Sequence, residues 1–330
     1  MTAFSVKANQ DSTDLASTDA NHSFECPICG GQQCEVVYSQ VEDAITHDLF
    51  SLQRCSRCGL CVTEPRVTSD RYYPKQYRAY GKPVRAMLSL FYAFRVRRWA
   101  RWRGRPGAVL EIGCGPGFML HAFQKRGWRV LGIERSEHVA QIGRHSYGVE
   151  ITTTEIHDLD ENLRFDLIVV FHVLEHIADP VALLRECAKH LTSNGRLIIA
   201  VPNFASWQAR FAGPRWLHLD VPRHLNHFTP ATLNRALGQA GLHLREIRFA
   251  SPEHDPYGWV ESTVSRLSGR MNIITRFLMG LDRPTPTVII SLAAGAILAI
   301  PAFLLATVSW PLKKGAIMEA IAQSGLSREQ

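Results

Sequence analysis

Short apolar runs alternate with longer helical stretches between residues 107 and about 250. The runs at 109–113, 128–134, 165–170 and 196–202 are rich in Val, Leu and Ile and are typical of buried strands. Strands that alternate with helices in this way indicate crossover connections between parallel neighbours. The pattern therefore predicts an α/β domain built on a parallel sheet.

Capping residues mark where the intervening helices begin and end. Ser136 stands at the start of one helix, and Gly148 ends it. The Asp-Pro pair at 179–180 opens a second helix, which Asn-Gly at 194–195 closes. The Thr-Pro pair at 229–230 opens a third. These signals agree with the strand pattern and support the same fold class.

A glycine-rich loop follows the first strand. Gly113, Gly115 and Gly117 let the backbone turn tightly and approach a ligand, and the next helix begins with free N–H groups. Glu134 ends the second strand about 20 residues later, the distance at which a carboxylate binds ribose hydroxyls. The G-x-G-x-G spacing and Pro116 do not fit the dinucleotide fingerprint. A nucleoside ligand is therefore expected at this loop.

Three stretches carry a family resemblance: VLEIGCGPGFML (109–120), FDLIVVFHVLEHIADP (165–180) and GRLIIAVPN (195–203). Together they resemble the class I S-adenosylmethionine-dependent methyltransferases of the ubiquinone-biosynthesis-like branch. The resemblance implies a Rossmann-like methyltransferase sheet, mostly parallel with a terminal antiparallel hairpin, and S-adenosylmethionine lying over the first loop. The cofactor contacts it implies are Glu111, Gly113, Gly115, Gly117, Glu134, Phe171 and, at the adenine, Glu155 or Ile156.

Candidate proton acceptors follow the third strand and recur further along the chain. The carboxyl ends of parallel strands face the ligand, which favours His172, Glu175 and His176. A second group lies in WLHLDVPRHLNHFT and contains His218, His224 and His227. From it His224 is added to the catalytic candidates. A structural role is the alternative for each histidine, and Glu175 with His176 suits a divalent metal as well.

The cysteines are concentrated before residue 62 and point to a reducing compartment. Cys26 and Cys29 form one C-x-x-C-G knuckle, and Cys55 and Cys58 form another. Four thiolates at this spacing satisfy tetrahedral zinc, whose binding energy folds segments too short to build a core. We expect a structural Zn²⁺ ribbon over residues 24–66; a redox pair or free thiols are the alternatives.

The charge excess is local. The chain has 37 Lys+Arg against 30 Asp+Glu, and the net charge of +7 matches seven arginines between residues 85 and 105. Trp99 and Trp102 share a helix face there. The pattern suits a helix at an anionic membrane surface; a solvated connector and an RNA-binding arm are the alternatives. The arginines are Arg85, Arg95, Arg97, Arg98, Arg101, Arg103 and Arg105.

An uncharged run extends from Pro284 to Leu312. It is long enough for a single membrane span, but Pro301 divides it into pieces that are each too short to cross. Lys313-Lys314 would then follow on the outer side, against the positive-inside rule. Residues 315–323 read as a strand, which the resemblance to the methyltransferase fold places back in the sheet. We therefore predict a helical hairpin that dips into the membrane or an interfacial insertion, with a soluble cap over the substrate cleft and a true single span as the alternatives.

These segments predict four parts: a disordered tail at 1–23, the zinc ribbon at 24–66, a basic aromatic connector helix at 67–106, and a methyltransferase domain at 107–330 with an apolar insertion at 284–312. The chain lacks motifs typical of base-methylating enzymes. We therefore expect a cytoplasmic, membrane-associated methyltransferase acting on an oxygen, nitrogen or carbon of a small or lipid-linked acceptor, of glycan or quinone type. An RNA methyltransferase and a degenerate zinc-dependent interaction module remain the alternatives.

Overall fold

Seven strands form the central sheet of the computed structural model, which describes residues 24–67, 69–73 and 82–325. The predicted disordered tail at 1–23 lies outside the described residues, as does the side chain of Arg85. The sheet order is β10-β11-β8-β7-β4-β5-β6. The strands are β4 (Ala108–Ile112), β5 (Arg129–Ile133), β6 (Ile151–Thr152), β7 (Phe165–Phe171), β8 (Leu191–Pro202), β10 (Leu242–Arg248) and β11 (Ile317–Ser324).

Strand directions confirm the predicted fold class. β4 pairs in parallel with β5 and β7, β5 with β6, and β7 with β8. β11 lies antiparallel between β8 and β10, so the sheet ends in the expected antiparallel hairpin. The chain order reverses between β4 and β7, which places a topological switch point at the glycine loop.

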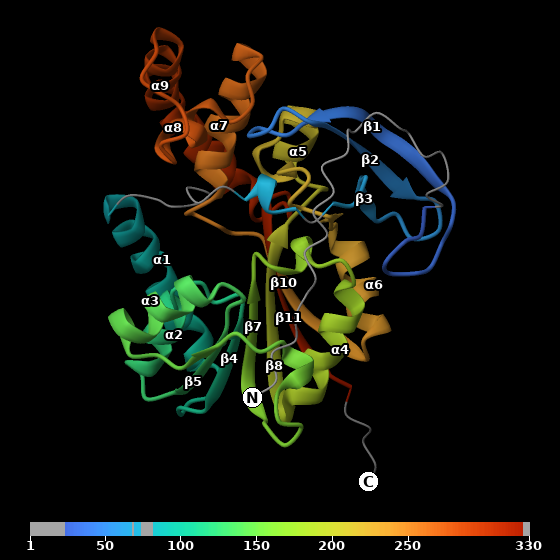
Figure 1. Cartoon of the computed structure of the whole chain (residues 1–330), viewed down its shortest axis with the longest axis vertical. Helices are drawn as coiled ribbons and strands as arrows, with labels where there is room; N and C mark the ends of the chain where they lie inside the picture. Colours follow the sequence, from blue (N-terminus) through green and yellow to red (C-terminus); the bar gives the residue numbers. More distant parts are fainter. Residues whose placement is uncertain (1–23, 68, 74–81, 326–330) are drawn as a thin grey trace.

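Helices cover both faces of this sheet (Figure 1). α1 (Lys82–Arg101), α2 (Phe118–Gln124) and α3 (Glu137–Tyr147) lie on one face, and α4 (Pro180–His190) and α6 (Pro230–Gln239) lie on the other. The predicted caps are present, since the side chains of Ser136, Asp179 and Thr229 each accept an N–H of the helix that follows. The predicted end of α4 is wrong: the helix stops at His190, and Asn194 already belongs to β8. The helix is therefore followed directly by β8, which begins at Leu191.

A second, antiparallel sheet carries the cysteine knuckles. Its order is β1 (Cys34–Glu42), β2 (Leu49–Cys55), β3 (Cys61–Glu64) and β9 (Asn226–His227). β9 comes from the part of the chain that also forms the central sheet, and it pairs with β3. Leu60 and Val62 are buried in the same core cluster as Phe228 and Leu237. The amino-terminal sheet and the central sheet are thus joined by one core.

The basic connector turns part of its charge inward. On α1, Trp99 is buried against the central sheet and donates its indole N–H to Glu319 on β11. Arg95 is buried as well, paired with Glu319 and with Glu253. Arg103 pairs with Asp166. The prediction that the Trp99 face meets a membrane is therefore wrong, and part of the charge invoked for an RNA-binding arm is paired within the protein.

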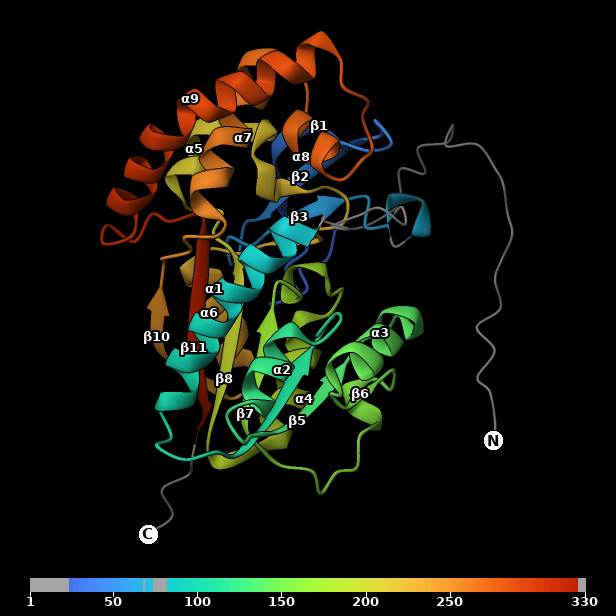
Figure 2. The same ribbon diagram turned by 90° about the vertical axis from the view of Figure 1, so that its left-hand side faces the viewer.

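Four helices form a carboxy-terminal layer beyond the carboxyl ends of the parallel strands (Figures 1 and 2). They are α5 (Trp207–Ala212), α7 (Asp255–Ser268), α8 (Ile273–Leu278) and α9 (Pro286–Ser309). The helix α9 continues through Pro301, so the prediction of two pieces joined as a hairpin is wrong. Its proline lies on the exposed side. The short turns are η1 (Asp70–Tyr72), η2 (Ile156–Asp158), η3 (Leu174–His176), η4 (Gly213–Arg215) and η5 (Leu217–Leu219).

Candidate active site and metal centre

The glycine loop is held in a left-handed backbone path after β4. Gly113, Gly115 and Gly117 have φ values of 66°, 54° and 77°, a region that side chains rarely tolerate. The amide of Gly113 donates to the carbonyl of Ile133 at the end of β5 (2.8 Å). These contacts fix the loop over the strand ends, where a ligand of a parallel sheet binds.

Two of these glycines are also required by packing. A Cβ added to Gly113 would lie 2.4 Å from Cγ2 of Val173, and one added to Gly117 would lie 2.7 Å from Cγ2 of Val149. A Cβ added to Gly115 would meet no atom of the described residues within 4 Å. The middle glycine therefore faces open space, as a residue lying under a ligand must.

Glu134 is oriented by the loop it faces. Its Oε2 accepts the amide N–H of Gly115 (3.0 Å), and its Oε1 accepts that of Ser136 (2.9 Å). Each carboxylate oxygen has a second lone pair, so the group can still accept hydroxyl donors. The geometry fits a carboxylate held ready for the hydroxyls of a ribose.

Glu111 provides a second acid beneath the loop. It is the fourth residue of β4 and is 3% exposed. Burial raises the pKa of its carboxyl to about 8. Its Oε2 makes no hydrogen bond among the described residues. A buried carboxyl with an unused oxygen suits a cationic ligand, and S-adenosylmethionine carries a sulfonium and an ammonium group.

The remaining cofactor candidates lie on either side of this loop. Glu155 is exposed and begins the η2 turn, whereas Ile156 is buried in the core. Phe171 ends β7 and is buried, with its ring 5.8 Å from that of Tyr92 and 4.7 Å from that of His172. Their contacts with a cofactor stay predictions.

The catalytic candidates converge beside the loop. His172 follows β7 with a positive φ of 54°, a strained conformation for a histidine. Its Nδ1 lies 3.3 Å from Oε1 of Glu175, which is 1% exposed. The same Oε1 lies 4.0 Å from Nε2 of His224. The ring of His176 lies 4.7 Å from the ring of His224. The structure thus brings all four predicted residues into one cluster.

Backbone carbonyls fix the protonation pattern of two of these imidazoles. Nδ1 of His176 bonds to the carbonyl of Arg223 (2.8 Å), and Nδ1 of His224 bonds to that of His218 (2.9 Å). A carbonyl only accepts, so each Nδ1 carries the proton and each neutral ring keeps a lone pair on Nε2. Glu175, His176 and His224 offer ligand atoms within 4.8 Å of one another, a donor set that suits a proton or a divalent cation.

Two predicted histidines, His218 and His227, lie outside this cluster, and a third histidine near it, His254, was not predicted from the sequence. His227 bonds to Oγ1 of Thr63 (2.9 Å), and burial lowers its pKa to about 3, so it is a neutral structural residue. His218 stacks edge-on against Trp216 (5.4 Å). His254 precedes α7, and its ring lies 4.8 Å from that of His172. No motif marks His254, because only the fold brings the start of α7 to the end of β7.

The four cysteines of the knuckles form a single cluster. Sγ of Cys26 lies 3.4 Å from that of Cys58, and Sγ of Cys29 lies 3.6 Å from that of Cys55. The two knuckles have matching geometry. Gly30 and Gly59 have φ values of 64° and 82°, and their amides donate to the carbonyls of Cys26 and Cys55 at 2.9 Å each. Four converging sulfurs on paired glycine turns are compatible with zinc.

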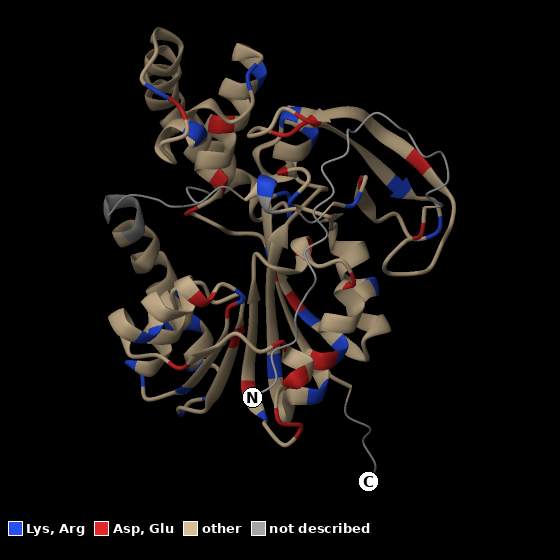
Figure 3. Ribbon diagram, in the orientation of Figure 1, with Lys and Arg blue, Asp and Glu red and all other residues tan. Residues whose placement is uncertain are grey.

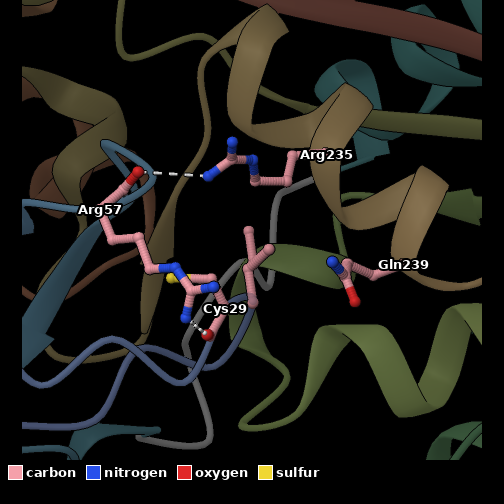
Figure 4. Close-up of a pocket in the computed structure, with 5 residues that line it drawn as sticks. Cys29, Arg57, Arg235 and Gln239 are labelled. Atoms are coloured by element: carbon pink, nitrogen blue, oxygen red, sulfur yellow. Dashed lines mark hydrogen bonds between the residues drawn. The ribbon is translucent and has the colours of Figure 1, made fainter.

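Two arginines stand beside this cluster (Figure 4). Arg57 donates to the carbonyl of Cys29 (3.1 Å), and Arg235 on α6 donates to the carbonyl of Arg57 (3.2 Å). Together with Ile28 and Gln239 they line a small surface pocket. Zinc held by four thiolates carries a net negative charge, which neighbouring guanidinium groups offset. The surroundings therefore also fit a charged metal centre.

The sheet order, the glycine loop and its two acids define a class I S-adenosylmethionine-dependent methyltransferase domain. Residues 85–247 match a family model described as "Methyltransferase domain". Among curated relatives, the ubiquinone biosynthesis O-methyltransferase of Rhodopseudomonas palustris is 28% identical over 149 residues, covering 42% of this chain and 59% of the relative. That of Alkalilimnicola ehrlichii is 30% identical over 154 residues, covering 42% and 62%.

The match is confined to this domain. The chain spans about three fifths of the length of these first relatives. A solved SAM-dependent methyltransferase from Archaeoglobus fulgidus superposes with a TM-score of 0.46 at 18% identity, over 72% of this chain and 94% of that one. The strands β1, β2 and β3 with their cysteines precede the matched residues, and α9 follows them.

Proposed function

We propose that this protein transfers the methyl group of S-adenosylmethionine to a small or lipid-linked acceptor. The observation that carries the proposal is the juxtaposition of two features at one edge of the sheet. The glycine loop, with Glu111 on β4 and Glu134 after β5, forms one of them. The other is the cluster in which His172 and Glu175, after β7, meet His224 from the loop before β9. One feature fits the cofactor and the other fits the acceptor.

The roles of the residues follow from their chemistry. The bound cofactor would supply an electrophilic methyl group, so the protein chiefly positions the acceptor and removes its proton. His172 and His224 flank the buried Glu175, and a proton taken by either imidazole is stabilised by that carboxylate. An imidazole beside a buried carboxylate suits an acceptor whose nucleophile must lose a proton. A phenolic hydroxyl is the simplest case.

Two observations favour a small organic acceptor. The named relatives are O-methyltransferases of ubiquinone biosynthesis, whose name points to a quinone-type acceptor. The arginines that would have formed a nucleic-acid arm are partly used in internal ion pairs.

We place the reaction in the cytoplasm, where S-adenosylmethionine and reduced cysteines coexist, and assign the cysteine cluster to a structural Zn²⁺. A screen of metabolite and lipid extracts with methyl-labelled cofactor would identify the acceptor.

Titration calorimetry with S-adenosylmethionine tests the cofactor site directly. We expect Glu134→Gln to weaken binding about 10- to 100-fold, because the hydroxyl bonds to a charged carboxylate become bonds to a neutral amide. Glu137→Gln is the matched control, since Glu137 is exposed on α3 and pairs with Arg144. Wild-type protein that does not bind, or equal affinities for Glu134→Gln and wild type, would refute the proposal.

Proton release tests the role of Glu111. Its raised pKa keeps the carboxyl largely protonated at pH 7, whereas a cationic ligand favours the ionised form. Binding should therefore release about one proton at pH 7, and affinity should rise with pH up to about 8. Calorimetry in buffers of different ionisation enthalpy measures this release, which Glu111→Gln should abolish. An enthalpy that is the same in every buffer contradicts the assignment.

A further inference from the structure

The helix α9 reverses the usual distribution of side chains on a helix of a soluble domain, because it buries small residues and exposes bulky apolar ones. Its buried stripe consists mainly of small residues: Val288, Ser291, Gly295, Ala302, Ala306 and Ser309. Its exposed side carries the bulky apolar residues: Ile289, Ile290, Ile297, Ile300, Phe303, Leu304, Leu305 and Val308. Ile297 is 78% exposed and Ile300 is 73% exposed. A surface helix of a soluble protein would bury these large side chains against the core and expose polar residues to water.

The exposed face is too apolar to be left uncovered. Among the described residues α9 is the one helix long and apolar enough to cross a membrane, and only 22% of its most apolar stretch is buried. Each bulky side chain left in water forgoes the burial that normally drives folding. Contiguous apolar surface of this kind marks a site of association with a protein or a membrane.

Cations stand at both ends of the helix, whereas none lies along it. Arg283 precedes α9, and Lys313 and Lys314 follow it, all three exposed. Arg266 and Arg270, near the end of α7, are exposed as well. Figure 3 shows α9 itself free of charged residues. An apolar face with basic ends complements a bilayer that carries anionic headgroups, and it does not complement a second, equally basic copy of this surface.

The contacts of α9 fix its orientation. Its buried stripe runs from Val288 to Ser309, so the helix lies along the protein over nearly its whole length. At Gly295 the approach is close: an added Cβ would lie 3.1 Å from Cδ1 of Ile274 and 3.2 Å from Cγ1 of Val260. At the end of α9, Trp310 donates to the buried Asp255 (2.5 Å). A helix fastened to α7 and α8 in this way cannot cross a bilayer alone.

We infer that the exposed face of α9 inserts into the surface of an anionic lipid bilayer, with the helix axis in the membrane plane. The bulky residues enter the boundary between headgroups and acyl chains, while Arg283, Lys313 and Lys314 contact the headgroups. The helix is the outermost element at the end of the molecule toward which the parallel strands point (Figures 1 and 2). The candidate active site therefore lies on the membrane-facing side of the sheet.

Vesicle flotation of the full chain tests the inference. Wild-type protein should float with vesicles of phosphatidylcholine and phosphatidylglycerol, without detergent. The double variant Ile297→Asp, Ile300→Asp should lose more than about tenfold in vesicle affinity, because two anchoring side chains become charged. The matched control is Val36→Asp, Leu49→Asp, which changes two exposed apolar residues of the amino-terminal sheet and should bind like wild type.

The basic ends are tested separately. Replacing Arg283, Lys313 and Lys314 by Gln should lower affinity for anionic vesicles about fivefold per charge, and affinity for pure phosphatidylcholine much less. Salt should weaken binding of the wild type to anionic vesicles more than that of the triple variant, which keeps only Arg266 and Arg270 of these exposed cations.

Several outcomes overturn the inference. Flotation that is unchanged in Ile297→Asp, Ile300→Asp excludes α9 as the contact. Wild-type protein that does not float but forms a dimer, which this double variant dissociates in analytical ultracentrifugation, assigns the face to a second copy. A monomer that does not float overturns the membrane assignment. Cofactor affinity, measured in parallel, separates failure of membrane binding from failure of the proposed methyltransferase function.

Discussion

The variant Cys26→Ser should lose the amino-terminal sheet and destabilise the protein by more than about 5 kcal/mol, because the binding energy of a structural zinc is folding energy. Cys26 is 2% exposed, and the cluster packs directly into the main core. Leu60 and Val62, which follow the second knuckle, are buried against α6 residues such as Leu237. Loss of the metal therefore exposes core residues beyond the knuckles themselves.

Metal analysis and thermal unfolding together check this expectation. Purified wild-type protein should contain one zinc per chain, and a chelator should lower its Tm markedly. Cys34→Ser is the matched control, because Cys34 is exposed and its thiol bonds only to the side chain of Gln53 in the described structure. A wild-type protein without stoichiometric metal would contradict the assignment, and so would equal Tm values for Cys26→Ser and Cys34→Ser.

The amino-terminal sheet also supports the candidate active site. Thr63 on β3 donates its hydroxyl to the carbonyl of His224 (2.7 Å), and its amide donates to the carbonyl of Leu225 (3.1 Å). The amide of Leu225 in turn donates to the carbonyl of Glu175 (2.8 Å). The four-cysteine cluster is therefore coupled through β3 to the loop that carries His224. If the proposed zinc is bound there, we expect its loss to impair catalysis even though the cysteines lie outside the cluster of His172, Glu175 and His224.

Local signals explain what could be predicted from the sequence. The strand runs, the caps at Ser136, Asp179 and Thr229 and the glycine loop each depend on a few consecutive residues, and the structure confirms them. The convergence of His172 and Glu175 was predictable for the same reason, since both follow one strand within four residues. The paired knuckles likewise predict the convergence of the four cysteines without knowledge of the surrounding fold.

Contacts between segments far apart in the chain could not be predicted from the sequence. Arg95 and Glu319 are far apart in sequence, so nothing in the arginine-rich stretch shows that one guanidinium is buried in an ion pair with β11. His254 reaches His172 only because β10 and α7 fold back over the strand ends. The prediction of a break at Pro301 failed for a different reason. A proline ends many helices, but Ala302 and Ala306, which follow it, are packed in one core cluster with residues of α7 and α8, and α9 stays continuous.

Arg223 is the other position where a single substitution should have a large effect. Its guanidinium is 1% exposed and lies between Asp43, at the end of β1, and Asp220 (2.6 and 2.7 Å). It also donates to the carbonyl of Tyr72 (3.0 Å), and its own carbonyl holds His176. Arg223→Leu leaves Asp43 buried without its cation, a change that costs about 3–5 kcal/mol.

Urea unfolding measures this cost, and a double-mutant cycle isolates its cause. Because the penalty comes from the stranded carboxylate, Arg223→Leu combined with Asp43→Leu should be less destabilising than Arg223→Leu alone. The control is Arg54→Leu, which breaks the exposed pair with Glu35 on the same sheet and should cost under about 1 kcal/mol. Equal costs for Arg223→Leu and Arg54→Leu would show that the buried pair does not hold the amino-terminal sheet against the loop of His224.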